Sequence, residues 1–176
     1  MTFFWIRSNI RPLFANSKNA AVKNILGGWQ LSGITSFMTG FPLTPTTTNA
    51  GLGLGGGVTN RPDFVSPMTY PSTRLAWFSP SSFAAPAPLA FGSSGKGVIR
   101  GPGRQNWNMA MFKTFAGIPW FGNPEGAKLE FRFETFNTFN HTQWNGVSTS
   151  YTSGDFGQVT SAFDPRTLQL GLKFLF

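Results

Sequence analysis

The sequence contains no cysteine, one histidine and few charged residues. Without cysteine there can be no disulfide scaffold, thiolate zinc site or cysteine nucleophile. The single imidazole, His141, excludes a histidine-rich metal centre and leaves no spare base for a catalytic triad. Only 11% of the 176 residues are charged, against about 25% in soluble domains. No window approaches 18 consecutive apolar residues, so no membrane-spanning helix is expected.

The abundant residue types, glycine, proline and the aromatic residues, indicate β-structure that faces an environment other than water. The 21 glycines and 13 prolines are too many for a helical bundle, and the 20 phenylalanines and six tryptophans make the chain too apolar for a disordered tail. The net charge is +8, yet lysine and arginine are scattered singly from Arg7 to Lys173. Without clustering there is no footprint for a nucleic acid, and none is expected as a partner.

Alternation of apolar and polar side chains predicts four strands, at about residues 24–38, 106–116, 127–137 and 166–176. A fifth candidate at residues 2–10 is weak. Eleven residues rise about 36 Å, which a tilt near 40° reduces to about 28 Å, close to the apolar band of an outer-membrane barrel. We expect an all-β fold of antiparallel transmembrane β-barrel strands. A soluble β-sandwich with one buried face also alternates and is the alternative.

The alternation also predicts which side chains face lipid and which face the lumen of the barrel. The uniformly apolar, aromatic-rich positions are predicted to face lipid: Trp107, Met109, Met111, Leu129, Phe131 and Phe133. The charged positions between them are predicted to face a hydrated lumen: Lys128, Glu130, Arg132 and Glu134. Four tryptophans fit an aromatic girdle at the membrane interface: Trp5, Trp29, Trp107 and Trp120.

Connection lengths predict the topology, because outer-membrane barrels pair short periplasmic turns with long extracellular loops. If the last strand runs inward, both long connections, residues 40–105 and 138–165, are extracellular and residues 117–127 form a periplasmic turn. Residues 1–23 are expected to hold a partial strand and a periplasmic turn, and residues 24–176 the barrel segment.

Several segments resemble outer-membrane receptors. Residues 168–176 look like the C-terminal signal that the barrel-assembly machinery recognises, carried by Leu168, Leu170, Leu172, Phe174 and Phe176. Three further segments are similar to the end of TonB-dependent receptors, most closely to the Oar-like subgroup with a carboxypeptidase-regulatory-like domain. They are Asn24 to Ile34, Arg100-Gly101-Pro102-Gly103 followed by Met111-Phe112-Lys113, and Phe131 to His141.

The resemblance implies energy-coupled uptake of a ligand across the outer membrane. It implies outer-membrane lipid, the remaining barrel and plug, and the TonB complex as partners, and no cofactor. It also implies a signal peptide, a TonB box, a plug and about 22 strands, so the chain is expected to be a C-terminal fragment of a larger barrel. Two alternatives remain: a structural or adhesive outer-membrane β-domain without transport, and a soluble basic β-domain that binds polyanions.

Sites for catalysis or metal binding are weakly indicated, and no enzymatic activity is expected. Glu130 and Glu134 could act as an acid–base pair, but alternating charges along a wet face explain them better. Asp155 and Asp164 could help to bind a cation, although a solvated loop accounts for them. The glycine-rich residues 51–57 lack the Gly-Lys-Ser/Thr ending of a phosphate loop.

The first prediction concerns Phe176. Deleting it from the full-length protein is expected to lower the amount of receptor at the cell surface severalfold, with accumulation in the periplasm. The thermal stability of what does assemble should change little, because lipid refills the space that the ring occupied. Surface labelling and thermal melts measure the two quantities; equal surface levels with and without Phe176 would refute the assembly role.

Overall fold

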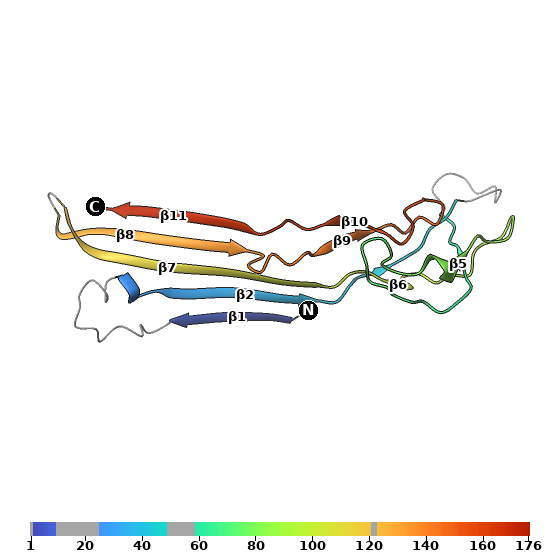
Figure 1. Cartoon of the computed structure of the whole chain (residues 1–176), viewed down its shortest axis with the longest axis horizontal. Helices are drawn as coiled ribbons and strands as arrows, with labels where there is room; N and C mark the ends of the chain where they lie inside the picture. The colour runs from blue at the N-terminus through green and yellow to red at the C-terminus, as the bar shows by residue number, and fades with distance from the viewer. Residues whose placement is uncertain (1, 10–24, 49–58, 121–122) are drawn as a thin grey trace. The chain divides into compact units, whose positions relative to one another are not determined.

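Antiparallel strands dominate the chain, as a computed structural model of residues 2–9, 25–48, 59–120 and 123–176 shows (Figure 1). The contacts divide the chain into two compact units. The sheet unit comprises Met1–Phe37, Gln105–His141 and Asp164–Phe176, and the loop unit comprises Met38–Arg104 and Thr142–Phe163.

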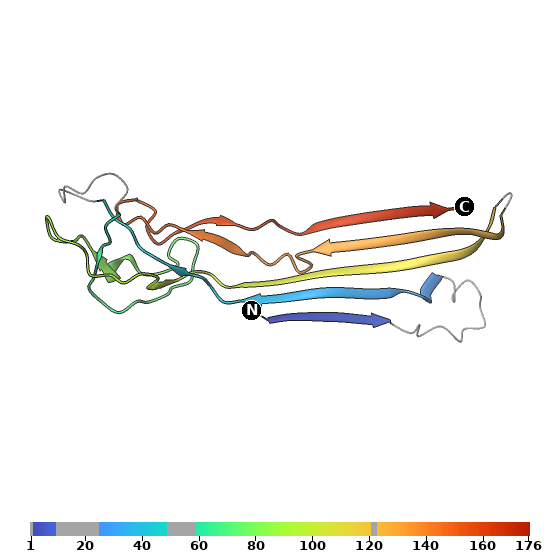
Figure 2. The same cartoon turned by 180° about the vertical axis from the view of Figure 1, so that it is seen from behind.

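Five strands make the sheet: β1 (Thr2–Asn9), β2 (Gln30–Met38), β7 (Arg104–Trp120), β8 (Asn123–Phe136) and β11 (Thr167–Leu175). Their order is β1-β2-β7-β8-β11, with β1 and β11 at the two edges, as Figures 1 and 2 show from opposite sides. The pairs β1–β2, β7–β8 and β8–β11 are antiparallel. The predicted all-β, antiparallel fold class is thus confirmed.

The strand bounds differ from the sequence prediction at three places. β2 starts at Gln30 instead of residue 24, because Ile25 and Leu26 are helical and Gly28 has φ 75°. Most of residues 117–127, expected as a turn, is strand: pairing of β7 with β8 continues past register shifts between Phe115 and Trp120. The weak candidate at residues 2–10 forms β1, whose eight residues all pair with β2.

The register separates the side chains onto two faces, because directly paired residues of an antiparallel sheet lie on the same side. Met111 pairs with Phe133, and Lys113 pairs with Phe131, which pairs in turn with Leu172. We call this side the apolar face; it holds Trp107, Met109, Met111, Lys113, Phe115, Leu129, Phe131, Phe133, Thr135, Leu168, Leu170, Leu172 and Phe174. We call the other side the polar face; it holds Phe112, Thr114, Lys128, Glu130, Arg132, Glu134, Gln169 and Lys173.

The loop unit has a core of its own, so the two long connections are folded segments. Phe78, Phe83, Ile99 and Phe156 are buried in it, and the rings of Phe78, Phe83 and Phe156 meet edge to face. Its short elements are β3 (Pro42–Leu43), β4 (Asp63–Phe64), a 3-10 turn (Pro80–Ser82), β5 (Phe83–Ala84), β6 (Ile99–Arg100), β9 (Trp144–Val147) and β10 (Val159–Ala162). Phe156 joins the two connections in one core.

The Arg100-Gly101-Pro102-Gly103 segment has a structural explanation within the loop unit. A Cβ on Gly40 would overlap the carbonyl of Gly101, so the two backbones can approach only because residue 40 is glycine. The Gly101 amide donates to the carbonyl of Phe41 (2.9 Å), and the Arg100 guanidinium donates to that of Gly40 (3.0 Å). The segment therefore packs on residues 40–41.

The second prediction tests the core of the loop unit. Phe78→Ala should destabilise this unit by about 3–5 kcal/mol, because its fully buried ring leaves a cavity behind. Pulse proteolysis of the purified protein across a urea series measures the loss. The control is Leu75→Ala, since that side chain is 67% exposed and its removal should leave the midpoint unchanged. If both variants unfold at the same urea concentration, the core assignment is wrong.

Candidate functional site

The polar face carries a hollow of about 540 Å³. Its lining includes charged, amide and hydroxyl side chains of the polar face together with the Phe112 ring: Gln30, Phe112, Thr114, Glu130, Arg132, Gln169 and Lys173. Lys113, Phe131, Gly171 and Leu172 also contribute to the lining. Three of the five strands contribute polar-face side chains here, and β2 adds Gln30. The hollow is a polar, mixed-charge surface on the sheet.

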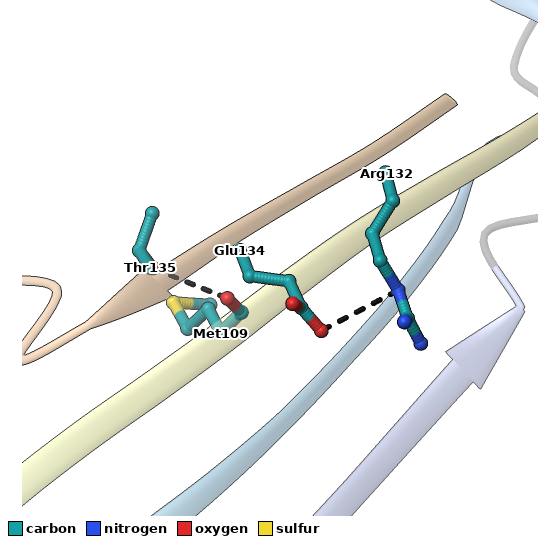
Figure 3. Close-up of polar contacts among 4 residues, drawn as sticks. All are labelled: Met109, Arg132, Glu134 and Thr135. Carbon is teal, nitrogen blue, oxygen red and sulfur yellow. Dashed lines mark hydrogen bonds and ion pairs between the residues drawn. The ribbon is translucent and has the colours of Figure 1, made fainter. Parts of the chain in front are cut away.

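Charges of opposite sign lie next to one another on the polar face. The Arg132 guanidinium lies 3.4 Å from the Glu134 carboxylate and 4.8 Å from the centre of the Phe112 ring, and Figure 3 shows the ion pair. The Arg132 side chain is 59% exposed, so the pair contributes little stability. The register sets Lys173 opposite Glu130. An arginine thus engages Glu134, which does not favour an acid–base role for the two glutamates.

Apolar side chains interrupt the polar face towards the end where the strands continue into the loop unit. A second hollow of about 210 Å³ has Ile34, Ala110, Phe112 and Phe136 among its lining residues. Ile34 and Phe136 are 42% and 44% exposed. The alternation pattern did not predict this patch, although an apolar residue interrupts the alternation in each of these strands.

On the apolar face, the side chains of β11 are mostly exposed, whereas those of β7 and β8 are half-buried. Leu170 and Leu172 are 69% and 71% exposed, and Phe176 is 81% exposed. Phe37 and Phe139 pack edge to face against Trp107. Thr135 is polar but buried, and its hydroxyl donates to the carbonyl of Met109 (Figure 3). Moving exposed apolar side chains out of water lowers the free energy, so this face is suited to an apolar environment.

Among the residues whose pairing and side chains are described, the register places Lys113 with its charge among these apolar side chains. It is only 4% exposed, and its ammonium group donates to the carbonyls of Ile25 (2.7 Å) and Gly27. The rings of Trp29 and Phe115 lie 5.1 Å and 4.8 Å from it. No pattern in the sequence indicates this site, because the acceptors are backbone atoms 86 and 88 positions away.

A network of amide side chains joins three strands at the end of the sheet where β8 stops. Asn137 accepts from the His141 amide (3.0 Å) and donates to the carbonyls of His141 (3.1 Å) and Asp164 (3.4 Å). Its own amide donates to the Asn108 side chain, and Asn140 accepts from the Arg166 amide. Asn137 and Asn140 have φ near 50°, a conformation that asparagine tolerates well. The network fixes how the chain leaves β8 and enters β11.

Comparison with known proteins identifies this two-faced sheet. The family model of the outer membrane beta barrel domain matches residues 11–169. The chain belongs to this family. Neither the curated proteins nor the solved structures contain a match. Among the described residues, no helix has the length and hydrophobicity needed to cross a membrane.

Family membership places the chain in the outer membrane, as the sequence predicted. In such barrels apolar side chains face lipid and polar ones face the lumen. The six residues predicted to face lipid lie together on the apolar face, and the four predicted to face the lumen lie together on the polar face. Their contact with lipid or with lumen water stays a prediction, as does the role of residues 168–176 in assembly.

The other candidate residues have structural surroundings. The His141 ring lies 3.5 Å from the Gln105 amide, and the Asp164 carbonyl belongs to the Asn137 network. Hydroxyls of Ser153 and Ser148 donate to the Asp155 carboxylate and lower its pKa. Across the described ranges, no three His, Cys, Asp or Glu side chains gather as metal ligands. Residues 51–57 and the side chains of Trp5 and Trp120 lie outside the description.

The third prediction tests the asparagine network. Asn137→Asp keeps the shape and the acceptor but replaces the donor that serves two carbonyls, so it should destabilise the sheet by about 1–3 kcal/mol. Thermal unfolding in detergent micelles, followed by circular dichroism, measures the change. Asn145→Asp is the matched control, because Asn145 is exposed on β9. Equal melting temperatures for both variants would show that the network does not hold the strands.

Proposed function

We propose that this chain supplies strands of a TonB-dependent receptor that takes up a ligand across the outer membrane with energy from the inner-membrane complex. One observation carries the proposal: the sheet has a hollowed face of mixed charge but two edges, β1 and β11, that no described strand covers. Edges cannot stay unpaired in lipid, and five strands fall short of the roughly eight that the smallest barrels need. A wider barrel with a wet interior satisfies both conditions.

The mechanism follows from that arrangement. Further barrel strands pair with the edges, and the barrel-assembly machinery recognises Leu168, Leu170, Leu172, Phe174 and Phe176. A plug closes the wide lumen against the polar face until the TonB complex displaces it. The loop unit lies on the extracellular side and gathers ligand. In this proposal the chain has no catalytic activity, binds no cofactor and has no nucleic-acid partner.

The folded loop unit favours a second candidate function. A region with its own phenylalanine core can present a stable surface outside the cell without any transport. Its exposed apolar side chains include Phe41, Leu89 and Phe91, at 64–71%. A structural or adhesive outer-membrane domain is therefore the alternative. The soluble polyanion-binding alternative is abandoned, because the chain belongs to an outer-membrane family.

The fourth prediction separates uptake from adhesion. Strains that lack this protein, or that lack a working TonB complex, should leave the same compounds in the culture medium that the parent strain depletes. Mass spectrometry of spent medium measures depletion, and re-expression of the wild-type protein is the control. If the deletion strain depletes the medium like its parent but adheres less to surfaces, the receptor proposal fails and the adhesive one stands.

A further inference from the structure

The segment before β2 crosses the apolar face of the sheet. We call residues 25–29 the strap. Trp29 lies edge to face on Phe131 of β8, with 5.7 Å between ring centres, although β7 separates β2 from β8 in the sheet. The Trp29 indole donates to the carbonyl of Ile25 (3.0 Å). The strap therefore covers part of a face whose β11 side chains are open.

Lys113 supplies hydrogen-bond donors to the strap, and the strap supplies acceptors to Lys113. Irregular backbone in hydrocarbon has carbonyls without donors, and each such group is unfavourable. A lysine on an apolar barrel face is also unfavourable without acceptors, most strongly near the bilayer centre and less towards the interface. The ammonium of Lys113 donates to the carbonyls of Ile25 and Gly27, and the Trp29 ring covers it. Neither group is left unsatisfied.

The position of the ammonium group along the strand suits a membrane interface. The Lys113 side chain reaches towards Phe115, which pairs with Leu129 and so lies level with Phe174 near the end of the chain. From Trp107 to Phe115 the strand rises about 26 Å, or about 20 Å along the membrane normal at a tilt near 40°. The apolar band of such barrels is about 25 Å tall, so the ammonium lies near its edge.

The strap presents apolar side chains outward. Ile25 and Leu26 are 60% and 48% exposed, although the chain places them over an apolar face. Helical turns that expose isoleucine, leucine and tryptophan beside a basic residue are typical of segments that lie in the lipid headgroup region. The surrounding surface matches that partner, because Leu172 beside Phe131 is also open.

We propose that the strap is a membrane-interface anchor. Ile25 and Leu26 insert among phospholipid chains at the membrane edge nearest the β7–β8 turn, and Lys113 holds the strap there through its backbone carbonyls. The proposal rests on the apolar face contacting lipid and does not depend on ligand uptake. The pairing of Lys113 with the two strap carbonyls would then fix the depth of the barrel in the bilayer.

The fifth prediction uses the absence of cysteine, which lets one spin label be placed without other substitutions. The protein carrying Leu26→Cys is labelled with a nitroxide and reconstituted into vesicles of phosphatidylethanolamine and phosphatidylglycerol. Power saturation then compares collisions with oxygen, which concentrates in lipid, and with a water-soluble nickel chelate. We expect oxygen collisions to dominate at Leu26→Cys and nickel collisions to dominate at Lys96→Cys, an exposed turn position.

Substitution of the lysine tests the mechanism. In the Leu26→Cys background, Lys113→Met should make the label more mobile and remove its excess of oxygen collisions, whereas Lys113→Arg, which still donates, should preserve both. Lys96→Met is the matched loss of a lysine and should change neither.

Two results would overturn the proposal. The first is a nickel excess at Leu26→Cys with Lys113 intact, a measurement that does not require the methionine variant to fold. The second is a label that Lys113→Met leaves unchanged. A label at Leu172→Cys distinguishes the causes: if it also favours nickel, the apolar face does not contact lipid.

Discussion

Every backbone amide that enters hydrocarbon must find a partner in the protein, and this constraint governs the sheet unit. The five-stranded sheet satisfies it by pairing along β2, β7 and β8, and β1 and β11 each have one edge that no described strand covers. The same constraint explains why β7 and β8 stay paired within residues 117–127, where the sequence predicted a turn. Pairing continues through register shifts at glycines with positive φ, Gly117 and Gly126, because an irregular ladder still satisfies more groups than an early loop.

Where the backbone departs from regular pairing, polar side chains replace the missing partners. Thr135 donates to the carbonyl of Met109 within the apolar face, and Lys113 donates to two carbonyls of the strap. Asn137 serves two carbonyls and one amide at the end of β8. All three side chains are buried. Buried polar groups of this kind are costly unless bonded, so each one limits the alternative paths that the chain can take.

The loop unit obeys a different rule. Three of its phenylalanines, Phe78, Phe83 and Phe156, gather in a core away from water, as in a soluble domain, while glycines allow backbones to touch where Gly40 meets Gly101. One chain thus combines a sheet with exposed apolar side chains on one face and a unit with a buried apolar core. The same residue type, phenylalanine, therefore has opposite exposure at Phe78 and Phe176.

The sequence by itself determined the strands with strict alternation and the separation of Glu130 from Phe131 onto opposite faces, because a period of two is a local property. It could not determine the strap, the asparagine network or the core around Phe156. Each depends on partners far apart in the chain, such as Lys113 and Ile25, and the acceptors are often backbone carbonyls, which every residue carries. Only the tertiary structure decides which of those carbonyls a given side chain reaches, because only folding brings them within hydrogen-bond distance.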